Sequence, residues 1–82
     1  MRIRKQELGD RNIVGRRIEE KRKELGLKQK DFLTQLQIAG IDLNASGLSK
    51  LEGQIRSVSD KELVLIAKTL DVSVLWLLGI EE

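Results

Sequence analysis

Two charged side chains lie on helical stripes that are otherwise apolar. Arg22 follows Ile18 by four residues and precedes Leu25 by three, so a helix that buries its apolar stripe also turns this guanidinium inward. Glu52 is placed in the same way, four residues after Leu48. A buried charge without a partner is costly, whereas Arg and a carboxylate form a bidentate, charge-assisted pair. We therefore predict an ion pair between Arg22 and Glu52; the alternative is that both side chains reach solvent separately.

The residues between 44 and 53 carry short polar side chains on the side away from Glu52. Small residues let a helix approach base edges closely, Ser donates or accepts hydrogen bonds, and Lys reaches guanine O6 and N7. The candidate base-contacting residues are Asn44, Ala45, Ser46, Ser49 and Lys50, and Gly53 is expected on the same exposed face. Asn44 is explained at least as well as the N-cap of its own helix. Many exposed helices have such a face, so alone it is weak evidence.

The residue types that build metal centres and most catalytic sites are missing. The 82 residues include no Cys, His or Tyr, which excludes zinc fingers, thiol redox chemistry and His-based catalysis. No Gly-rich phosphate loop follows a strand pattern. We therefore expect no metal, no cofactor and no enzymatic activity. Phe32 and Trp76 are the only aromatic residues, so the stacking platforms that bind single-stranded nucleic acid are missing, while duplex DNA remains open as a partner.

The net charge of +2 conceals an uneven distribution. Residues 1–30 carry eleven basic and five acidic side chains, a net +6, whereas residues 31–82 carry four and eight, a net −4. A basic half is one way to bind a polyanion, although a run of charges is more often the solvated face of a helix. We expect residues 1–9 to be a basic tail, either flexible or disordered, ahead of a single domain over residues 10–82.

The spacing of the apolar residues is helical along almost the whole chain and predicts an all-α fold. The expected helices cover residues 10–25, 28–39, 44–53, 59–70 and 73–78. Ser59 and Glu62 have the spacing of a capping box, which is the clearest helix start in the sequence. Leu25 and Ile55 are expected on buried stripes. No apolar run is long enough for a membrane span and no secretory signal is visible, so we expect a cytoplasmic protein.

Four stretches of the chain, in this order, are similar to a known family. They are residues 26–32 (GLKQKDF), 48–53 (LSKLEG), 63–70 (LVLIAKTL) and 71–79 (DVSVLWLLG). Together they resemble the Cro and phage-repressor type, or XRE-like, helix-turn-helix family over about residues 12–80. The resemblance implies a compact, lambda-repressor-like five-helix bundle whose second and third helices read DNA, and dimers that address two half-sites. It also implies that Gln29 bonds a DNA phosphate and that an Arg–Glu pair is buried at Arg22 and Glu52.

Three features depart from the family's pattern. Residues 37–43 exceed the usual tight turn, so the second helix is expected to extend and a loop to lead into the third. Gly47 lies inside the third helix where Ser or Thr is usual, which costs about 1 kcal/mol of helix stability relative to Ala. Leu75 and Trp76 stand where acidic or polar residues are usual and suggest a self-association patch, which serves as a dimer surface. The alternative is that Trp76 folds back onto the core.

The function that we expect is sequence-specific binding of double-stranded DNA by a repressor-like homodimer. The protein is then a cytoplasmic, nucleoid-associated transcriptional regulator that reads the major groove with residues 44–53. Base contacts set specificity, whereas phosphate contacts set register and affinity. The expected phosphate contacts are Arg16, Arg17, Lys28, Gln29, Lys30 and Arg56. The alternative is a protein-interaction module on the same fold, either antitoxin-like or an adaptor.

Overall fold

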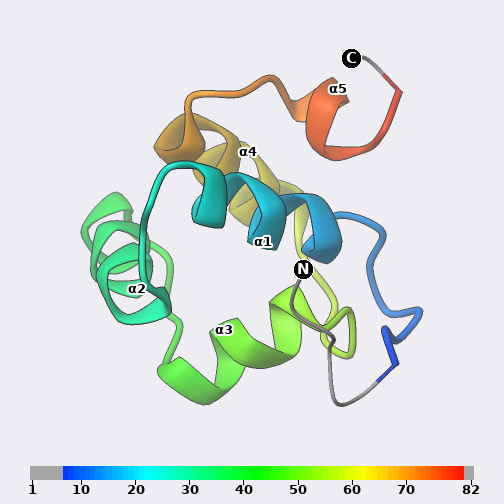
Figure 1. Ribbon diagram of the computed structural model, residues 1–82, viewed down its shortest axis with the longest axis horizontal. Coiled ribbons are helices and arrows are strands. Elements are labelled where there is room, and N and C mark those ends of the chain that lie inside the picture. Colours follow the sequence, from blue (N-terminus) through cyan, green and yellow to red (C-terminus); the bar gives the residue numbers. More distant parts are fainter. Residues whose placement is uncertain (1–6, 81–82) are drawn as a thin grey trace.

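The computed structural model describes residues 7–80 and arranges them as a compact helical bundle (Figure 1). The helices are α1 (Gly15–Glu24), α2 (Gln29–Ala39), α3 (Ala45–Glu52), α4 (Asp60–Leu70) and α5 (Val74–Leu77). No β-strand occurs in residues 7–80, so the predicted all-α, five-helix fold class is confirmed. None of the helices in this part of the chain has the length and apolar character needed to cross a lipid bilayer.

Side-chain caps determine where three of the helices begin. The side-chain oxygens of Asn44, Ser59 and Ser73 each accept a hydrogen bond from the backbone N–H three residues later, at 2.7, 3.2 and 3.0 Å. Glu62 accepts in return from the backbone N–H of Ser59 at 3.0 Å, which completes the predicted capping box. The predicted starts of the third, fourth and fifth helices are therefore confirmed.

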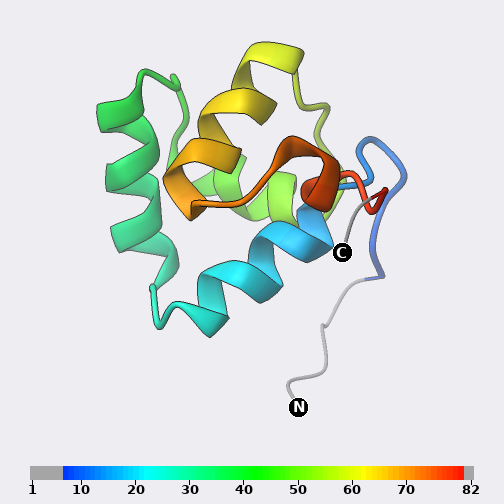
Figure 2. The same cartoon turned by 90° about the horizontal axis from the view of Figure 1, so that it is seen from above.

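The apolar core is shared by all five helices, the residue before α1 and the link between α2 and α3. Its buried residues are Val14, Ile18, Phe32, Leu36, Ile41, Leu43, Leu48, Leu51, Ile66, Ala67, Leu70 and Leu77. Helix α3 packs against α1 and α2, while α4 packs against α1, α2 and α5. Figure 1 places α3 and α5 on opposite sides of α1, and the view from above in Figure 2 has α5 nearest the viewer. Helix α3 therefore has one side on the core and one side free of the bundle.

The predicted first helix, over residues 10–25, is shorter in the structure and spans only Gly15–Glu24. Leu25 follows the last helical residue and is about half exposed, so its predicted burial is wrong. Ile55 is also exposed, because α3 ends three residues before it. Gly53, expected on the exposed face of α3, is buried instead, since residues 9–12 lie against it. Each of these errors lies at a helix end, where apolar periodicity gives least information.

The link between α2 and α3 is a loop, as expected, but it is anchored in the core. Helix α2 ends at Ala39, and Ile41 and Leu43 of the loop are both buried. Gln37 Nε2 donates a hydrogen bond to the Leu43 carbonyl oxygen at 2.9 Å. A Cβ atom at Gly47 would lie only 2.8 Å from Leu43 Cδ1. The glycine inside α3 therefore makes room for this anchor, which offsets part of its low helix propensity.

Candidate functional site

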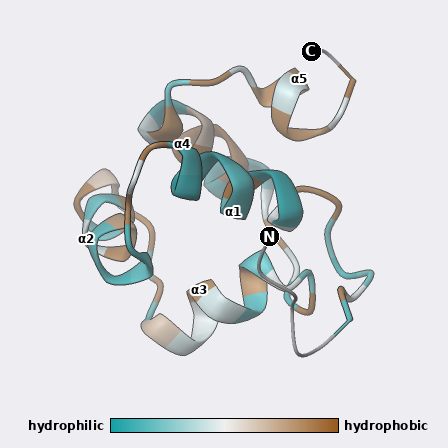
Figure 3. Ribbon diagram, in the orientation of Figure 1, coloured by the Kyte–Doolittle hydropathy of each residue, from teal (hydrophilic) through white to brown (hydrophobic). Residues whose placement is uncertain are grey.

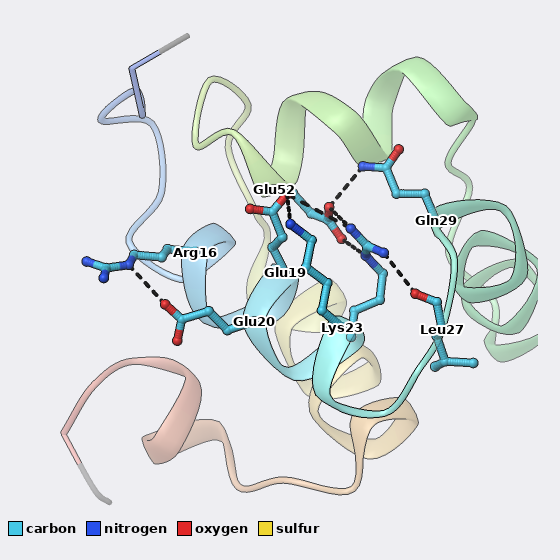
Figure 4. A network of polar contacts seen from close by, with 8 residues as sticks. Arg16, Glu19, Glu20, Lys23, Leu27, Gln29 and Glu52 are labelled. Carbon is cyan, nitrogen blue, oxygen red and sulfur yellow. Dashed lines mark hydrogen bonds and ion pairs between the residues drawn. The ribbon is translucent and has the colours of Figure 1, made fainter. Parts of the chain in front are cut away.

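An ion pair between α1 and α3 is buried in the bundle (Figure 4). Arg22 Nε donates to Glu52 Oε2 at 2.7 Å, and Arg22 Nη2 donates to Glu52 Oε1 at 3.1 Å. Glu52 is 0% exposed and Arg22 is 6% exposed. The structure thus joins the two charges that the sequence places on apolar stripes, in the bidentate geometry typical of strong charge-assisted pairs.

Two further contacts complete the surroundings of this pair. Gln29, in the first turn of α2, donates from Nε2 to Glu52 Oε1 at 2.9 Å. Arg22 Nη1 donates to the Leu27 carbonyl oxygen at 2.8 Å. Among residues 7–80, every buried side-chain nitrogen and oxygen has a hydrogen-bond partner. Because α1, α2 and α3 meet at one carboxylate, the network fixes the last turn of α3 relative to both other helices.

The exposed side of α3 carries short side chains, with Lys50 as the one long exception. All five residues expected to contact bases are exposed, namely Asn44, Ala45, Ser46, Ser49 and Lys50. The Asn44 side-chain oxygen accepts from the backbone N–H of Gly47, which favours the capping role. Figure 3 colours the middle of α3 pale, between the hydrophilic and hydrophobic extremes. This outer face of α3 (residues 45, 46, 49 and 50) is therefore free to approach another molecule closely.

The cations of α1 are largely paired with acidic residues of the same helix. Four ion pairs lie along it: Arg16–Glu20 at 3.0 Å, Lys21–Glu24 at 3.0 Å, Lys23–Glu19 at 3.8 Å and Arg22–Glu19 at 3.9 Å. Helix α1 is accordingly strongly hydrophilic in Figure 3. Its five cations outnumber its three carboxylates. Most of the α1 cations are therefore engaged with carboxylates of their own helix.

Arg17 is turned toward α5 rather than α3. Its guanidinium carbon lies 4.9 Å from the centre of the Trp76 ring, and Lys21 Nζ lies 5.9 Å from the same point. These are cation–π contacts, which hold α5 against α1. Since α5 and α3 lie on opposite sides of α1 (Figure 1), the predicted phosphate contact of Arg17 does not fit DNA bound at α3.

Several cations near α3 have no acidic partner within the described part of the chain. They are Arg11, Lys28, Lys30 and Lys50, and all four are exposed. Lys28 and Lys30 flank Gln29, whose bond to Glu52 brings the start of α2 to the end of α3. The N-cap position of α2 has no side-chain hydrogen bond, so the first backbone N–H groups of the helix are open. These four cations are therefore available to an anionic partner that approaches α3.

Arg56 is engaged with Glu62 at the start of α4. Its Nη2 donates to Glu62 Oε2 at 2.9 Å, and its Nη1 donates to Glu62 Oε1 at 3.3 Å and to the Ser57 carbonyl oxygen at 3.0 Å. The hydrogen bond from Arg56 lowers the pKa of Glu62 below its usual value of 4.5; partial burial opposes this, and the Ser59 backbone N–H adds to it. The phosphate contact that the sequence predicts for Arg56 would compete with this pair.

The lowered pKa of Glu62 predicts a dependence of stability on acid. Because the folded state favours the carboxylate, its contribution is present above pH 4.5 and is lost as the pH falls through the lower folded pKa. We expect Glu62→Gln to reduce the free energy of unfolding at neutral pH by up to about 1 kcal/mol. The difference between wild type and variant should shrink as the pH falls through the lowered pKa of Glu62, because the carboxylate is then protonated. Urea unfolding at neutral pH and at a series of acidic pH values measures this.

The control for this titration is Glu24→Gln, which removes a more exposed ion pair on α1. Its effect should be smaller at neutral pH, since exposed pairs contribute little. A gap between wild type and Glu62→Gln that is equally large in acid would contradict the role assigned to the Arg56–Glu62 pair.

Residues 9–12 are bound to the chain that leaves α3, which the sequence analysis missed. The backbone N–H groups of Gly9 and Arg11 donate to the carbonyl oxygens of Gly53 and Gln54, both at 2.9 Å. Of the predicted basic tail, residues 1–6 lie outside the described residues, whereas Gly9 belongs to the folded bundle. The available signal was Asn12, since Asn just ahead of a helical pattern is a favoured cap. We call residues 9–12 the N-terminal strap.

The two residues of the predicted self-association patch on α5 differ in exposure. Leu75 is 45% exposed, but Trp76 is partly buried against the core and lies beneath Arg17. Trp76 therefore folds back onto the core, which is the alternative that the sequence left open. Ile80 is 71% exposed, and its N–H donates to the Leu75 carbonyl oxygen at 3.0 Å. Leu75 and Ile80 are the apolar residues that this end of the bundle exposes.

No metal site and no similar known protein was found that bears on the candidate site in the described residues. Residues 7–80 contain no group of three or more Cys, His, Asp or Glu side chains placed to hold a metal ion. No family model matches the chain, and no curated protein matches it. The candidate site is thus defined by its own contacts: a buried carboxylate on one side of α3 and an exposed, short-chained face on the other.

Proposed function

We propose that the protein binds double-stranded DNA in a sequence-specific manner, as a transcriptional regulator that lays α3 in the major groove. The observation that supports this is the two-sided character of α3. Its inner side is fixed through the 0% exposed Glu52, and its outer face is exposed. The major groove is about 12 Å wide and admits an α-helix, and small outward side chains let the helix approach base edges.

The outer face of α3 offers complementary kinds of base contact. Ser46 and Ser49 donate or accept hydrogen bonds, and Lys50 donates to guanine O6 and N7. Ala45 presents a methyl group that suits contact with the thymine methyl. Asn44 is engaged as a cap, so we place it at the edge of the reading surface.

Phosphate contacts are proposed for the start of α2 and for Arg16. Lys28 and Lys30 are exposed and have no acidic partner in residues 7–80, and the uncapped first turn of α2 offers backbone N–H groups to an anion. Gln29 donates one amide N–H to Glu52 and retains a second one for a phosphate oxygen. Arg16 is strongly exposed, and its bond to Glu20 is easily exchanged for a phosphate in water.

A homodimer is part of the same proposal. Two copies of α3 that read successive major grooves on one side of the duplex need half-sites about 34 Å apart, which a symmetric dimer provides. Leu75 and Ile80 are exposed apolar residues at the end of the bundle away from α3. These two side chains therefore offer an apolar surface for self-association that does not overlap the outer face of α3.

The test is selection of bound sequences from a pool of random duplexes. We expect a recovered inverted repeat, because a dimer of a sequence-specific reader selects two related half-sites. Gel retardation at about 50 mM salt accompanies the selection, since any helix-turn-helix reader should retain duplex DNA non-specifically under those conditions. A pool that shows neither enrichment nor salt-sensitive retention would refute the proposal.

Substitution of two different lysines should weaken DNA binding in two different ways. Lys50→Ala is expected to cost about 1–3 kcal/mol at one base position, because it removes a contact to a base edge. Lys28→Ala is expected to weaken all sequences alike and to reduce the salt dependence by about one phosphate contact. Fluorescence anisotropy with the selected duplex and its single-base variants measures both effects.

The matched control for the two lysines is Lys68→Ala in the last turn of α4, next to α5. This variant removes the same charge from a part of the bundle that does not adjoin the outer face of α3. Equal losses at every base position for Lys50→Ala and Lys28→Ala would contradict the division into base and phosphate contacts.

A protein-interaction module is the second candidate function. The observation that favours it is the pairing of most α1 cations within their own helix together with the exposed side chains of Leu75 and Ile80. Such a module, antitoxin-like or an adaptor, would retain no duplex DNA at low salt. The retention experiment therefore separates the two functions directly.

A further inference from the structure

The N-terminal strap closes over the C-terminal end of α3. Two of its backbone N–H groups donate to the Gly53 and Gln54 carbonyl oxygens at 2.9 Å. Gln54 Nε2 donates back to the Gly9 carbonyl oxygen at 3.2 Å. The last turn of a helix leaves its carbonyl groups without partners inside the helix. Here the strap supplies donors both to that turn and to the residues that follow it.

Asn12 joins the strap to two helices at once. Its Oδ1 accepts from the backbone N–H groups of Val14 and Gly15 at 3.1 and 2.8 Å, and so caps α1. Its Nδ2 donates to the carbonyl oxygens of Leu51 and Arg56 at 3.1 and 2.7 Å. A single amide therefore links the first turn of α1 to the last turn of α3 and to the segment that follows.

The close approach of the strap depends on the absence of a side chain at Gly9. A Cβ atom there would meet the Gln54 carbonyl oxygen and would lie 2.6 Å from Ile55 Cγ2. Because one of these neighbours is backbone, it has little freedom to give way. The strap is therefore seated on the end of α3 at van der Waals contact, with no room for even a methyl group.

Besides the strap's backbone bonds to Gly53 and Gln54, two side-chain anchors hold the end of α3. The first is the Glu52 carboxylate, bound by Arg22 and Gln29. The second is the backbone at Leu51, bound by Asn12. A helix held only through one carboxylate is free to rotate about that point, whereas a second anchor on its backbone fixes its direction.

We propose that Asn12 is a positioning residue for base reading. It touches no base; by fastening α3 to α1 it fixes the direction in which the outer face of α3 enters the groove. This inference rests on the proposed function, because it concerns how that function discriminates between sequences. Without the Asn12 donor, α3 tilts, base contacts weaken, and the phosphate contacts from α2 persist.

The test uses Asn12→Ser, since Ser keeps the capping oxygen for α1, adds no charge and is too short to reach the two carbonyl groups. The ratio of affinities for the selected and a scrambled duplex is expected to fall at least about tenfold, the scale of one or two lost base contacts. Affinity for the scrambled duplex should stay within about twofold. Both are measured well below the melting temperature of each variant.

The matched control is Ser73→Ala, which removes the cap of α5 on the far side of α1. It lowers stability without touching α3, so it should leave the affinity ratio unchanged. If Asn12→Ser does not fold, Gln54→Met takes its place. Without adding charge, it removes both side-chain bonds of Gln54, the one to the Gly9 carbonyl oxygen and the one from the Arg16 backbone N–H.

Hydrogen exchange gives a readout that does not need DNA. The amide N–H groups of Gly53, Gln54 and Ile55 close the end of α3 and should exchange at least about tenfold faster in Asn12→Ser, but not in Ser73→Ala. An unchanged affinity ratio or unchanged exchange, with a wild type that prefers its selected duplex, would overturn the positioning role alone. A wild type that prefers no duplex would overturn the proposed function, and with it the positioning role of Asn12.

Discussion

Replacing Arg22 with methionine is expected to lower the free energy of unfolding by about 3–5 kcal/mol. The substitution removes the guanidinium that binds both oxygens of the Glu52 carboxylate, which is 0% exposed. The remaining Gln29 amide does not compensate for a buried negative charge. Urea unfolding followed by far-ultraviolet circular dichroism measures the loss.

Two further variants separate the cost of a lone charge from the value of the pair. Arg22→Met combined with Glu52→Leu should recover most of the loss, because removing both charges leaves nothing buried and unpaired. Arg16→Met removes an ion pair whose side chains are 70% and 59% exposed, and should change the free energy of unfolding by less than about 1 kcal/mol. If Arg22→Met costs no more than Arg16→Met, the network is not what holds α3 in place.

Gly15→Ala is expected to destabilise the fold by about 1–3 kcal/mol. Gly15 is the first residue of α1, where α1 touches the end of α3. A Cβ atom there would meet the Leu51 carbonyl oxygen and would lie 2.8 Å from the Glu52 carbonyl oxygen. Both are backbone atoms of α3, so relief requires the two helices to separate. This outweighs the advantage of Ala over Gly in a helix, which is at most about 1 kcal/mol.

Thermal unfolding of Gly15→Ala should show a drop of roughly 4–8 °C for each kcal/mol lost. The matched control is Gly47→Ala, a second glycine in the first turn of a helix. The nearest atom to a Cβ there is the tip of the Leu43 side chain rather than a backbone atom, so a small shift of that side chain gives relief. This variant should stay within about 1 kcal/mol of wild type. The opposite ranking of the two alanines would refute the close contact between α1 and α3.

The features that the sequence predicted well are those that one helix determines locally. The caps at Ser59 and Ser73 are local: each Ser oxygen accepts from the backbone N–H three residues later, and this geometry recurs at helix starts in general. The inward positions of Arg22 and Glu52 likewise follow from the period of a helix, and the cost of burying a lone charge then indicates a partner.

The features that the sequence analysis missed depend on contacts between distant segments. Asn12 donates to backbone carbonyl groups 39 and 44 residues away, and backbone acceptors leave no mark on residue type. The first helix was predicted too long for the same reason, since the strap's bonds to distant backbone groups keep residues 9–12 outside α1. A count of charges over residues 1–30 also cannot tell which cations are engaged within the fold, as Arg16 is by Glu20.

Trp76 is the only tryptophan of the chain, and it is stacked beneath Arg17 on the side of α1 away from α3. Its intrinsic emission is therefore a local spectroscopic probe of the α5 end of the bundle. A ligand that occupies α3 should leave this emission nearly constant, whereas self-association through Leu75 and Ile80 should shift its wavelength. One unlabelled sample thus distinguishes the two kinds of complex.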